Sequence, residues 1–467
     1  MALVPPSPES KTPNNIFFRL LEDLWLPVVL LLATAALGWW VNARFTFGGP
    51  LWLAFRYLVR FGPIWLPLLL FYIWWKEWLY YLRSRSVAEL TPVLLEIKLP
   101  REVLRSPLAM EVIFSHLYQT GAASHLEQYW EGKLRPWFSL ELCSLGGSVR
   151  FFVYSPDRKW RDLVEAQFYA QYPEAVITEV PDYTDRVSYD FSRFWMWGTY
   201  FSLIKDDVYP LKTYIDYGLD KPAEEEEKVD PLTATLEYLG SLKPHEQCWI
   251  QILIQAHKKE DFQGGFAPLP FTEKPNWKGA AEKEIEKIRE AATPKPKKEG
   301  QFSFPNPTKG QVEKIAALER SIAKYPFKTM IRTMYVTTTE GGIGPASIPG
   351  LIASVRQYNS QELNGLKLGW FTDHSDFVKD LRIIFSWFGP FQRYLEERAN
   401  VMRRQMLDAY KRRSFFYPPY KNFHGQPFIL NSEELATMFH LPGRVATTPT
   451  LQKVESKRAE APSNLPL

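Results

Sequence analysis

Cysteine is scarce in this chain of 467 residues, which has two, Cys143 and Cys248. Two thiols cannot form the disulfide framework on which small secreted domains depend. Both cysteines lie inside apolar, strand-like runs. We therefore expect buried free thiols, although a single disulfide between the two stays open as an alternative.

Net charge is also low. The formal charge of +4 is small for a chain of this length, so it gives no argument for nucleic-acid binding. Hydrophobic residues make up 46% of the chain and aromatic residues 15%. This composition is sufficient for real hydrophobic cores, and the length allows two or three domains besides a membrane anchor.

The sequence motifs of common enzymes, metal sites and nucleotide sites are missing. There is no GxxxxGK[ST], HExxH or GxSxG motif and no paired CxxC, and the glycine-rich stretch GGIGPASIPG lacks the lysine of a phosphate loop. His116 and His125 have no third ligand at a usable spacing, so we interpret each as a satisfied or exposed histidine. We expect no catalytic residue, no cofactor, no bound metal and no enzymatic activity.

Acidic residues form two small groups that resemble acid/base pairs only superficially. Asp206, Asp207 and Asp216 lie beside strand-like segments, and a run of glutamates occupies positions 224–227. We interpret the aspartates as solvated turn residues and the glutamates as a solvated loop.

Two long apolar runs are the strongest positive signal. Leu24–Val41 and Ile64–Tyr81 each approach the roughly 20 apolar residues that a helix needs to cross a bilayer. Tryptophans lie at or near the ends of both runs, as in the aromatic belt of a membrane protein. The sequence therefore predicts a hairpin of two transmembrane helices over residues 24–82, after an N-terminal tail of residues 1–23.

The orientation of this predicted hairpin is weakly marked, because basic residues precede it, follow it and occupy its connection. We favour both ends in the cytoplasm, which implies a multi-pass protein of the cytoplasmic membrane with lipid as a partner. A cleaved secretory signal ending near Ala33–Ala35 is the alternative for the first run, but apolar sequence continues to Val41.

The region 88–190 alternates between strand and helix patterns. A strand pattern over Val93–Leu99 is followed by a helix that begins near Ser106 and by two strand patterns joined at Gly146 and Gly147. A second helix and a fourth strand complete the region. The order β-α-β-β-α-β is that of a ferredoxin-like unit.

The same order recurs over residues 195–373, interrupted by an insertion at 258–310 that is rich in Pro, Lys and Glu. Residues 374–445 have helical patterns, and residues 446–467 form a polar tail that we expect to be flexible. The predicted fold class is a membrane-anchored α+β protein, with two N-terminal transmembrane helices, two ferredoxin-like units and a helical C-terminal region.

Two groups of residues are candidates for contact with nucleic acid or lipid. Arg150, Phe152 and Tyr154 share one strand face, as the base-stacking aromatics of RNA-recognition sheets do, although the full signature is missing. Packing of this face within the chain is the alternative. A basic group could meet phosphates or acidic lipid, or form the solvated face of an amphipathic helix. Its members are Arg403, Arg404, Lys411, Arg412 and Arg413.

Three stretches carry a resemblance to a known family: LLEIKLPRE, VRFFVYSPDRKWRDLVEAQFYAQYPEAVITEVPDY and FILNSEELATMFHLPGRVATTPTLQKVESKRAEAPSNLP. They are similar to the non-motor N-terminal region of bacterial membrane proteins related to conjugative coupling proteins and other type IV secretion ATPases. In fused members this region leads into a HerA/FtsK-like motor that bears the phosphate loop. This chain ends at Leu467, where that motor would begin, so the resemblance does not carry ATP hydrolysis over to it.

The resemblance implies a membrane-anchored, non-catalytic assembly or docking subunit for a DNA- or protein-transport ATPase that a separate chain supplies, and it leaves homo-oligomerisation open. The alternative is a membrane-tethered nucleic-acid-binding protein that uses the first repeat's sheet and the basic helix. A short capped helix after Asn431 is too small to bury its own apolar residues, so we expect these to dock the partner. They are Leu435, Met438, Phe439 and Leu441. Packing of this helix on the second repeat is the competing interpretation.

Overall fold

The computed structural model describes residues 57, 60–100, 105–121, 127–221, 229–257, 277–293, 306–344, 347–372, 383, 387–443 and 453–454. The chain divides into two compact units. The first comprises residues 1–86, 125–133 and 264–266, and the second comprises the rest, including the whole sheet.

The described part of the first unit consists of most of helix α3 (Gly62–Ala88) and a π-helical turn at Glu127–Glu131. Aromatic rings join these two elements. Trp75 packs against Tyr129 with ring centroids 5.8 Å apart, and Trp78 packs edge-on against Trp130 at 6.2 Å. The tryptophans of the second apolar run therefore pack partly within this unit.

The expected membrane hairpin needs correction. Within the part of the chain that the structure describes, no helix combines the length and the apolar character that a membrane crossing requires. The second predicted run lies in α3, where Lys76 and Glu77 interrupt it, and the first run, Leu24–Val41, lies outside the described residues. The predicted fold class with two transmembrane helices, and the multi-pass location inferred from it, are therefore wrong.

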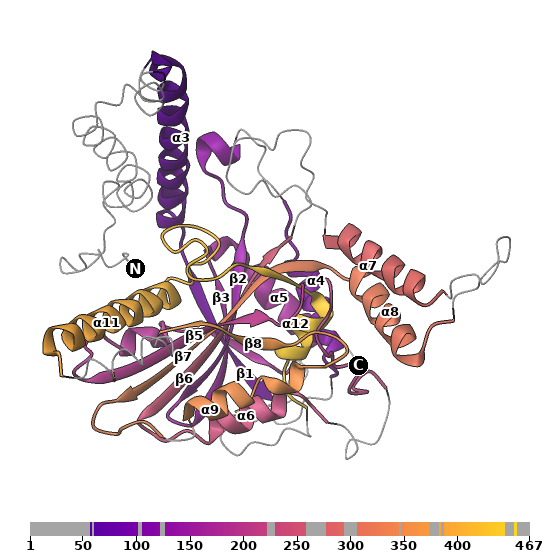
Figure 1. The fold of residues 1–467 in the computed structure, drawn as a ribbon. Helices are drawn as coiled ribbons and strands as arrows, with labels where there is room; N and C mark the ends of the chain where they lie inside the picture. The colour runs from indigo at the N-terminus through magenta and orange to yellow at the C-terminus, as the bar shows by residue number, and fades with distance from the viewer. Residues whose placement is uncertain are drawn as a thin grey trace, which may run out of the picture. The chain divides into compact units, whose positions relative to one another are not determined.

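The second unit is built on one ten-stranded sheet (Figure 1). Its main path has the order β10-β1-β3-β2-β6-β7-β5-β8, with β4 added to β1 and β9 added to β7. Only the β1–β10 pairing is parallel among the described strands. The strands are β1 (Val93–Pro100), β2 (Trp137–Leu145), β3 (Ser148–Ser155), β4 (Val176–Glu179), β5 (Phe194–Leu203), β6 (Glu246–Ala256), β7 (Pro326–Thr338), β8 (Leu366–Phe371), β9 (Phe428–Asn431) and β10 (Lys453–Val454).

Two successive β-α-β-β-α-β repeats supply eight of these strands. The first places its strands in the order β4-β1-β3-β2 and the second in the order β8-β5-β7-β6, so both have the ferredoxin-like connectivity. The repeats meet where β2 pairs with β6, from Trp137↔Gln255 to Leu145↔Gln247. Their helices are α4 (Leu108–Leu117) and α5 (Arg161–Gln171) in the first repeat, and α6 (Leu232–Gly240) and α9 (Ser347–Ala353) in the second.

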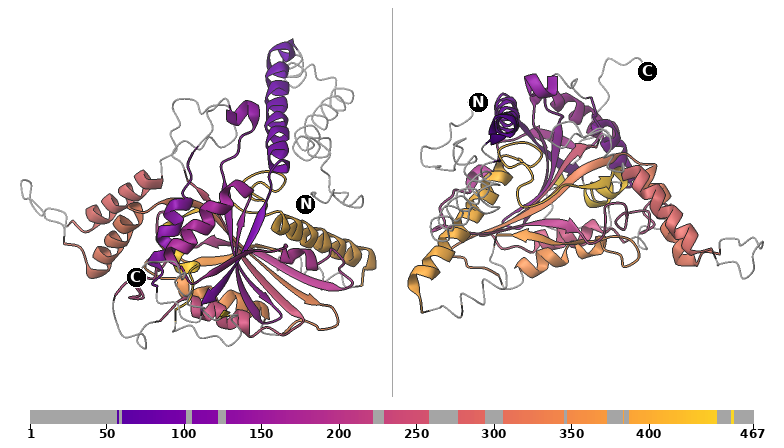
Figure 2. Two further views of the ribbon diagram at one scale, coloured as in Figure 1. Left: turned by 180° about the vertical axis from the view of Figure 1, so that it is seen from behind. Right: turned by 45° about the horizontal axis from the view of Figure 1, so that its top comes forward.

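Alternating side chains divide the sheet into two buried faces. On β2, Leu140 and Leu142 point to the cluster covered by α4, α5, α6, α9 and α12 (Ser432–Met438), which we call the helix face. Trp137 and Cys143 point to the opposite cluster, covered by α11 (Gly389–Lys411), which we call the α11 face. Figure 2 shows α11 on the other side of the strands from α6 and α9.

Gly146 and Gly147 form the turn between β2 and β3 that the sequence predicts as a hairpin. Their φ angles are +64° and +85°, and a type I′ turn requires this left-handed conformation at both central residues. The two strands pair from Ser139↔Tyr154 to Leu145↔Ser148. The turn therefore sets the register of the strand that also joins the two repeats.

The segment between β6 and β7, which includes the predicted insertion at 258–310, contains two further helices, α7 (Trp277–Ala291) and α8 (Lys309–Ile322). They pack against each other, and Ala281 and Ile285 of α7 and Leu318 of α8 are buried. Thr308 begins α8 with a capping box that it shares with Gln311.

Candidate functional site

One row of laterally paired residues crosses the α11 face of the sheet. Adjacent strands pair Glu96 with Phe152, Phe152 with Glu141, Glu141 with Gln251, Gln251 with Arg332 and Arg332 with Tyr200. The row spans six strands and passes through the β2–β6 junction. A buried charge without a partner is very costly. The polar side chains of this row must therefore hydrogen-bond to one another or to residues that pack on the α11 face.

Arg332 connects this row to the end of α11. Its guanidinium is fully buried and donates to the carbonyl oxygens of Ala409, at 2.7 Å, and Ser414, at 3.1 Å. Positive charge is favoured at a helix C-terminus, where carbonyl groups lack helical partners. Arg332 also donates to Gln251, whose amide donates to Glu141 at 2.7 Å. The row is therefore one connected hydrogen-bond chain from β7 to β2.

Arg413 extends this chain of hydrogen bonds by donating to Glu141 at its β2 end. It follows α11 in a left-handed conformation, with φ +49°, and is fully buried. Its Nε and Nη2 donate to the two oxygens of Glu141 at 2.9 and 3.0 Å, and it also pairs with Asp182. The bidentate geometry suits a guanidinium and a carboxylate, so Arg413 neutralises the buried acid at the centre of the sheet.

Burial controls the ionisation of the groups around this pair. It raises the pKa of the Cys143 thiol and of the Tyr183 and Tyr410 phenols well above their ordinary values. Burial also acts to raise the pKa of Asp182, but the neighbouring Arg413 outweighs it, and this pKa lies below the ordinary value. At neutral pH the thiol is therefore protonated, a state in which cysteine is not a nucleophile.

A groove of about 380 Å³ opens at the Glu96 end of the row. Arg150, which lines it, donates to Glu96, with 3.3 Å between Nη1 and Oε1. The lining combines charged residues of both signs with apolar residues. These residues are Glu96, Leu145, Arg150, Phe152, Val180, Pro181, Asp182, Tyr183, Asp185 and Arg186.

The structure brings together four of the residues predicted to contact nucleic acid or lipid, and it covers two of them. The ring of Phe152 is stacked on Tyr183, with centroids 4.9 Å apart and an interplanar angle of 23°. The guanidinium of Arg413 lies 4.8 Å from the centre of the Tyr154 ring. These contacts match the alternative of packing within the chain, because the ring faces that would stack on bases are occupied by the protein itself.

The other predicted basic residues follow α11. Arg403 donates to Asn400 at 3.2 Å, Lys411 donates to the Val187 carbonyl at 2.8 Å, and Arg412 pairs with Asp408 at 2.9 Å. Arg404 is exposed. Contact of this group with nucleic acid or lipid stays a prediction.

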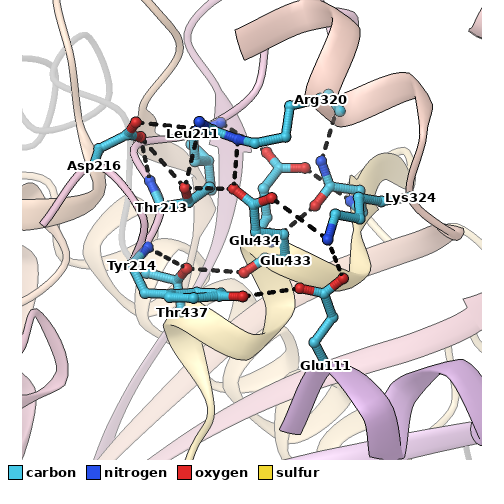
Figure 3. A network of polar contacts seen from close by, with 12 residues as sticks. Glu111, Leu211, Thr213, Tyr214, Asp216, Arg320, Lys324, Glu433, Glu434 and Thr437 are labelled. Atoms are coloured by element: carbon cyan, nitrogen blue, oxygen red, sulfur yellow. Dashed lines mark hydrogen bonds and ion pairs between the residues drawn. The ribbon is translucent and has the colours of Figure 1, made fainter. Parts of the chain in front are cut away.

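A second polar network lies beneath α12, shown in Figure 3. The helix begins with a capping box between Asn431 and Glu434. The two oxygens of Glu434 accept from the backbone N–H groups of Leu211, at 2.7 Å, and Asn431, at 2.8 Å. Its neighbour Glu433 accepts from the Thr213 hydroxyl at 2.6 Å. Both glutamates are almost fully buried.

Cations from α8 and the residues just after it complete this network. Arg320 lies 3.0 Å from Glu433 and 3.1 Å from Asp216, and Lys324 lies 2.6 Å from Glu111 of α4. The hydroxyl of Tyr214 also donates to Glu111, at 3.0 Å. The network therefore joins α12 to α4, to the insertion and to the 211–216 segment, which are far apart in the sequence.

Burial perturbs both acids of α12 in the same direction. It raises the pKa of Glu434 to about 8, although two backbone donors oppose the shift. It also raises the pKa of Glu433, against the opposing effects of Thr213, Arg320 and Lys324. Glu433 and Glu434 therefore bind a proton more readily than a solvated glutamate would.

The four residues predicted to dock a partner lie in the helix-face core. Leu435 and Phe439 are fully buried, Leu441 is 1% exposed and Met438 is 4% exposed. The Phe439 ring packs edge-on against Phe151 of β3 at 5.7 Å, and α12 lies against α4. In this structure their contacts include the first repeat, and their docking role stays a prediction.

The aspartates interpreted as solvated turn residues are partly structural. Asp207 accepts a hydrogen bond from the backbone of Ile429, at 3.3 Å, and Asp216 pairs with Arg320. His116 lies 2.9 Å from the carbonyl oxygen of Val112, and Cys143 and Cys248 are buried free thiols. His125 and the glutamates at 224–227 lie outside the described residues.

Sequence reasoning missed Glu141, Arg332 and the role of Arg413 as its partner. One signal was available, because Glu141 is the only charged residue in the strand WFSLELCSL. A single charge in a buried strand indicates a buried partner. The sequence does not identify that partner, because Arg413 is 272 positions away.

Comparison of the chain with protein-family models, with curated proteins and with solved structures found no match.

Proposed function

We propose that this chain is a non-catalytic assembly subunit that docks a transport ATPase supplied by a separate chain. The resemblance of three sequence stretches to the non-motor region of type IV secretion ATPases supports the choice of partner. The polar clusters of the body support a scaffold rather than a reaction centre, because Arg413, Glu141 and Asp182 are committed to one another.

An exposed apolar stripe at the start of α11 and along one face of it carries this proposal. Tyr394 and Val401, 56% and 53% exposed, lie seven residues apart on one face of the helix, and Trp387, 78% exposed, lies two residues before the helix begins. Buried residues of α11, such as Leu395 and Ala399, lie on another side of the helix. Large exposed aromatic groups in a contiguous patch mark interaction surfaces.

The charged residues beside the stripe indicate the chemistry of the partner. Arg393, Arg398 and Arg404 are exposed on the same helix, and tryptophan, tyrosine and arginine are the residues that most often dominate the energy of protein interfaces. Glu396 and Glu397 are exposed on this helix too, so the stripe fits an apolar pocket on the ATPase whose rim carries charges of both signs.

The test is co-purification of the tagged full-length chain from its own cells, with the bound ATPase identified by mass spectrometry through its phosphate-loop peptide. We expect Trp387→Ala combined with Tyr394→Ala to reduce the recovered ATPase by at least about tenfold, because hot-spot residues each contribute about 2 kcal/mol or more. The matched control is Glu396→Ala, an exposed residue on the opposite side of the same helix from Tyr394, which should leave recovery unchanged. Equal recovery with the double variant, or no such ATPase with the wild-type chain, contradicts the proposal.

A further inference from the structure

We propose that the groove at the Glu96 end of the row binds a free α-amino acid with an apolar side chain, in its zwitterionic form. This goes beyond the docking function and does not depend on it. The inference rests on the volume of the groove, on the hydrogen-bonding groups of its lining that lack partners, and on the balance of their charges.

The groove has the size of a small-ligand site. Its volume of about 380 Å³ lies within the range of roughly 300–1,000 Å³ that is usual for such sites. Three of its lining residues, Glu96, Phe152 and Tyr183, are only 5%, 2% and 3% exposed. Asp185 and Arg186, from the turn at Tyr183–Arg186, are exposed. The lining therefore combines nearly buried residues with residues that solvent reaches.

Glu96 is a nearly buried carboxylate with few donors. Its Oε1 accepts from Arg150 Nη1 at 3.3 Å, and its Oε2 lies 3.9 Å from the ammonium of Lys98. The first distance is long for a charge-assisted hydrogen bond, and the second exceeds hydrogen-bond distance. Among the residues that the structure describes, Oε2 therefore has no hydrogen-bond donor. A ligand ammonium in the groove would supply one.

Two guanidinium groups of the lining have the opposite need. Arg150 directs Nη1 to Glu96, and neither its Nε nor its Nη2 has an acceptor in the described part of the chain. Nε is buried and Nη2 is not, so Nη2 is the donor that a ligand can reach. Arg186 is exposed and makes no ion pair with any described residue. A ligand carboxylate is the acceptor that suits guanidinium groups best.

The balance of charge selects a zwitterion. Asp182 also lines the groove, but it is paired with Arg413. The remaining charges of the lining are two carboxylates and two guanidiniums, those of Glu96, Asp185, Arg150 and Arg186. A dianion such as phosphate would lie beside both carboxylates, and like charges at short distance repel. An α-amino acid carries its carboxylate and its ammonium on one carbon, so it can meet the neighbouring guanidinium and carboxylate together.

Apolar residues of the lining favour an apolar ligand side chain. Leu145, Val180 and Pro181 line the same groove as the charged groups. The charged groups recognise the part that all amino acids share, and the apolar residues discriminate between side chains. Burial of a leucine side chain should make leucine bind at least about tenfold more tightly than glycine.

Isothermal titration calorimetry of the full-length chain with L-leucine tests the proposal. Two analogues each lack one charge: leucine amide has no carboxylate, and N-acetylleucine has no ammonium. We expect each to bind at least about tenfold more weakly than leucine, because hydrogen bonds to charged groups are lost. Inorganic phosphate should not displace leucine. Equal binding of the three compounds, displacement by phosphate, or no saturable heat with leucine up to about 10 mM overturns the proposal.

Variants separate recognition of the ligand from a general loss of structure. Arg186→Gln should weaken leucine binding at least about tenfold and leave the thermal midpoint unchanged, because this exposed side chain makes no described ion pair. It should not affect leucine amide, which has no carboxylate to lose. Glu96→Gln should remove the preference for leucine over N-acetylleucine. Arg356→Gln, at an exposed arginine of the second repeat, is the matched control and should change none of these affinities. Leucine binding that is undiminished in both Arg186→Gln and Glu96→Gln overturns the proposal.

Discussion

Arg413 shows how one residue organises the α11 face. Its left-handed backbone conformation is unfavourable for a residue with a Cβ, of the order of 1–3 kcal/mol, and persists only where the surroundings enforce it. In this protein the ion pairs of Arg413 with Glu141 and with Asp182 enforce that conformation. The end of α11 is therefore anchored at the centre of the sheet by charge pairing as well as by apolar packing.

Removal of this side chain should be strongly destabilising. We expect Arg413→Ala to lower the free energy of unfolding by about 3–5 kcal/mol, because it leaves Glu141 buried without its counter-charge. Its neighbour Arg412 offers a matched control. That arginine is half exposed and paired with Asp408, so Arg412→Ala should cost no more than about 1 kcal/mol. Urea denaturation followed by circular dichroism compares the two, and a similar loss in both variants would show that the buried pair has no special weight.

The sequence predicted some of these residue environments and not others. Burial of Cys143 and Cys248 followed from the apolar runs around them. The sequence places Arg413 with the basic residues of a solvated or phosphate-binding helix, because its charge suggests exposure and its acidic partners lie far away in the chain. A long-range ion pair leaves no periodic pattern in a sequence, so the burial of this residue could not be predicted.

At the level of elements, α12 shows which features depend on neighbouring residues and which depend on residues far away in the chain. The sequence indicated a short helix capped near Asn431, and the structure has that capping box. The same residues gave no sign that Glu433 and Glu434 would be buried, because a solvated glutamate pair at a helix start is common and favourable. Burial of these acids depends on Arg320, Lys324 and the 211–216 segment.

The β2–β3 turn depends on its two glycines. We expect Gly147→Ala to destabilise the protein by about 1–3 kcal/mol, since φ is +85° and a Cβ would lie 2.8 Å from the carbonyl oxygen of Leu242. Gly310→Ala in α8 is the control, because no atom lies within 4 Å of its Cβ position and alanine favours helix. Thermal unfolding should show a lower midpoint for Gly147→Ala and an equal or higher one for Gly310→Ala. Equal midpoints for Gly147→Ala and the wild type would argue against a strained turn.

At the scale of the whole molecule, the two repeats share their central strands. The β2–β6 ladder places Leu140 of the first repeat opposite Ile252 of the second, and both side chains are buried in the helix-face cluster. The repeats belong to the same compact unit. A substitution that destabilises this junction should therefore destabilise both repeats.

We expect Ile252→Ala to destabilise the two repeats together, by about 2–5 kcal/mol, because it opens a cavity where their cores join. Hydrogen exchange separates the repeats: amides of β3 report on the first and amides of β7 on the second. Both sets should lose protection to the same extent. Protection lost in β7 alone would mean that the repeats unfold independently.

Features that depend on neighbours a few residues apart were determined by the sequence alone. The alternation of the strands, the Gly146-Gly147 turn and the cap of α12 belong to this class, because backbone sterics and local hydrogen bonds govern them. Pairing of β2 with β6, insertion of Arg413 between Glu141 and Asp182, and enclosure of Glu434 were decided by the tertiary structure. These contacts join segments separated by one hundred to nearly three hundred residues, and their free energy comes from desolvation and charge pairing that arise only when the sheet has formed.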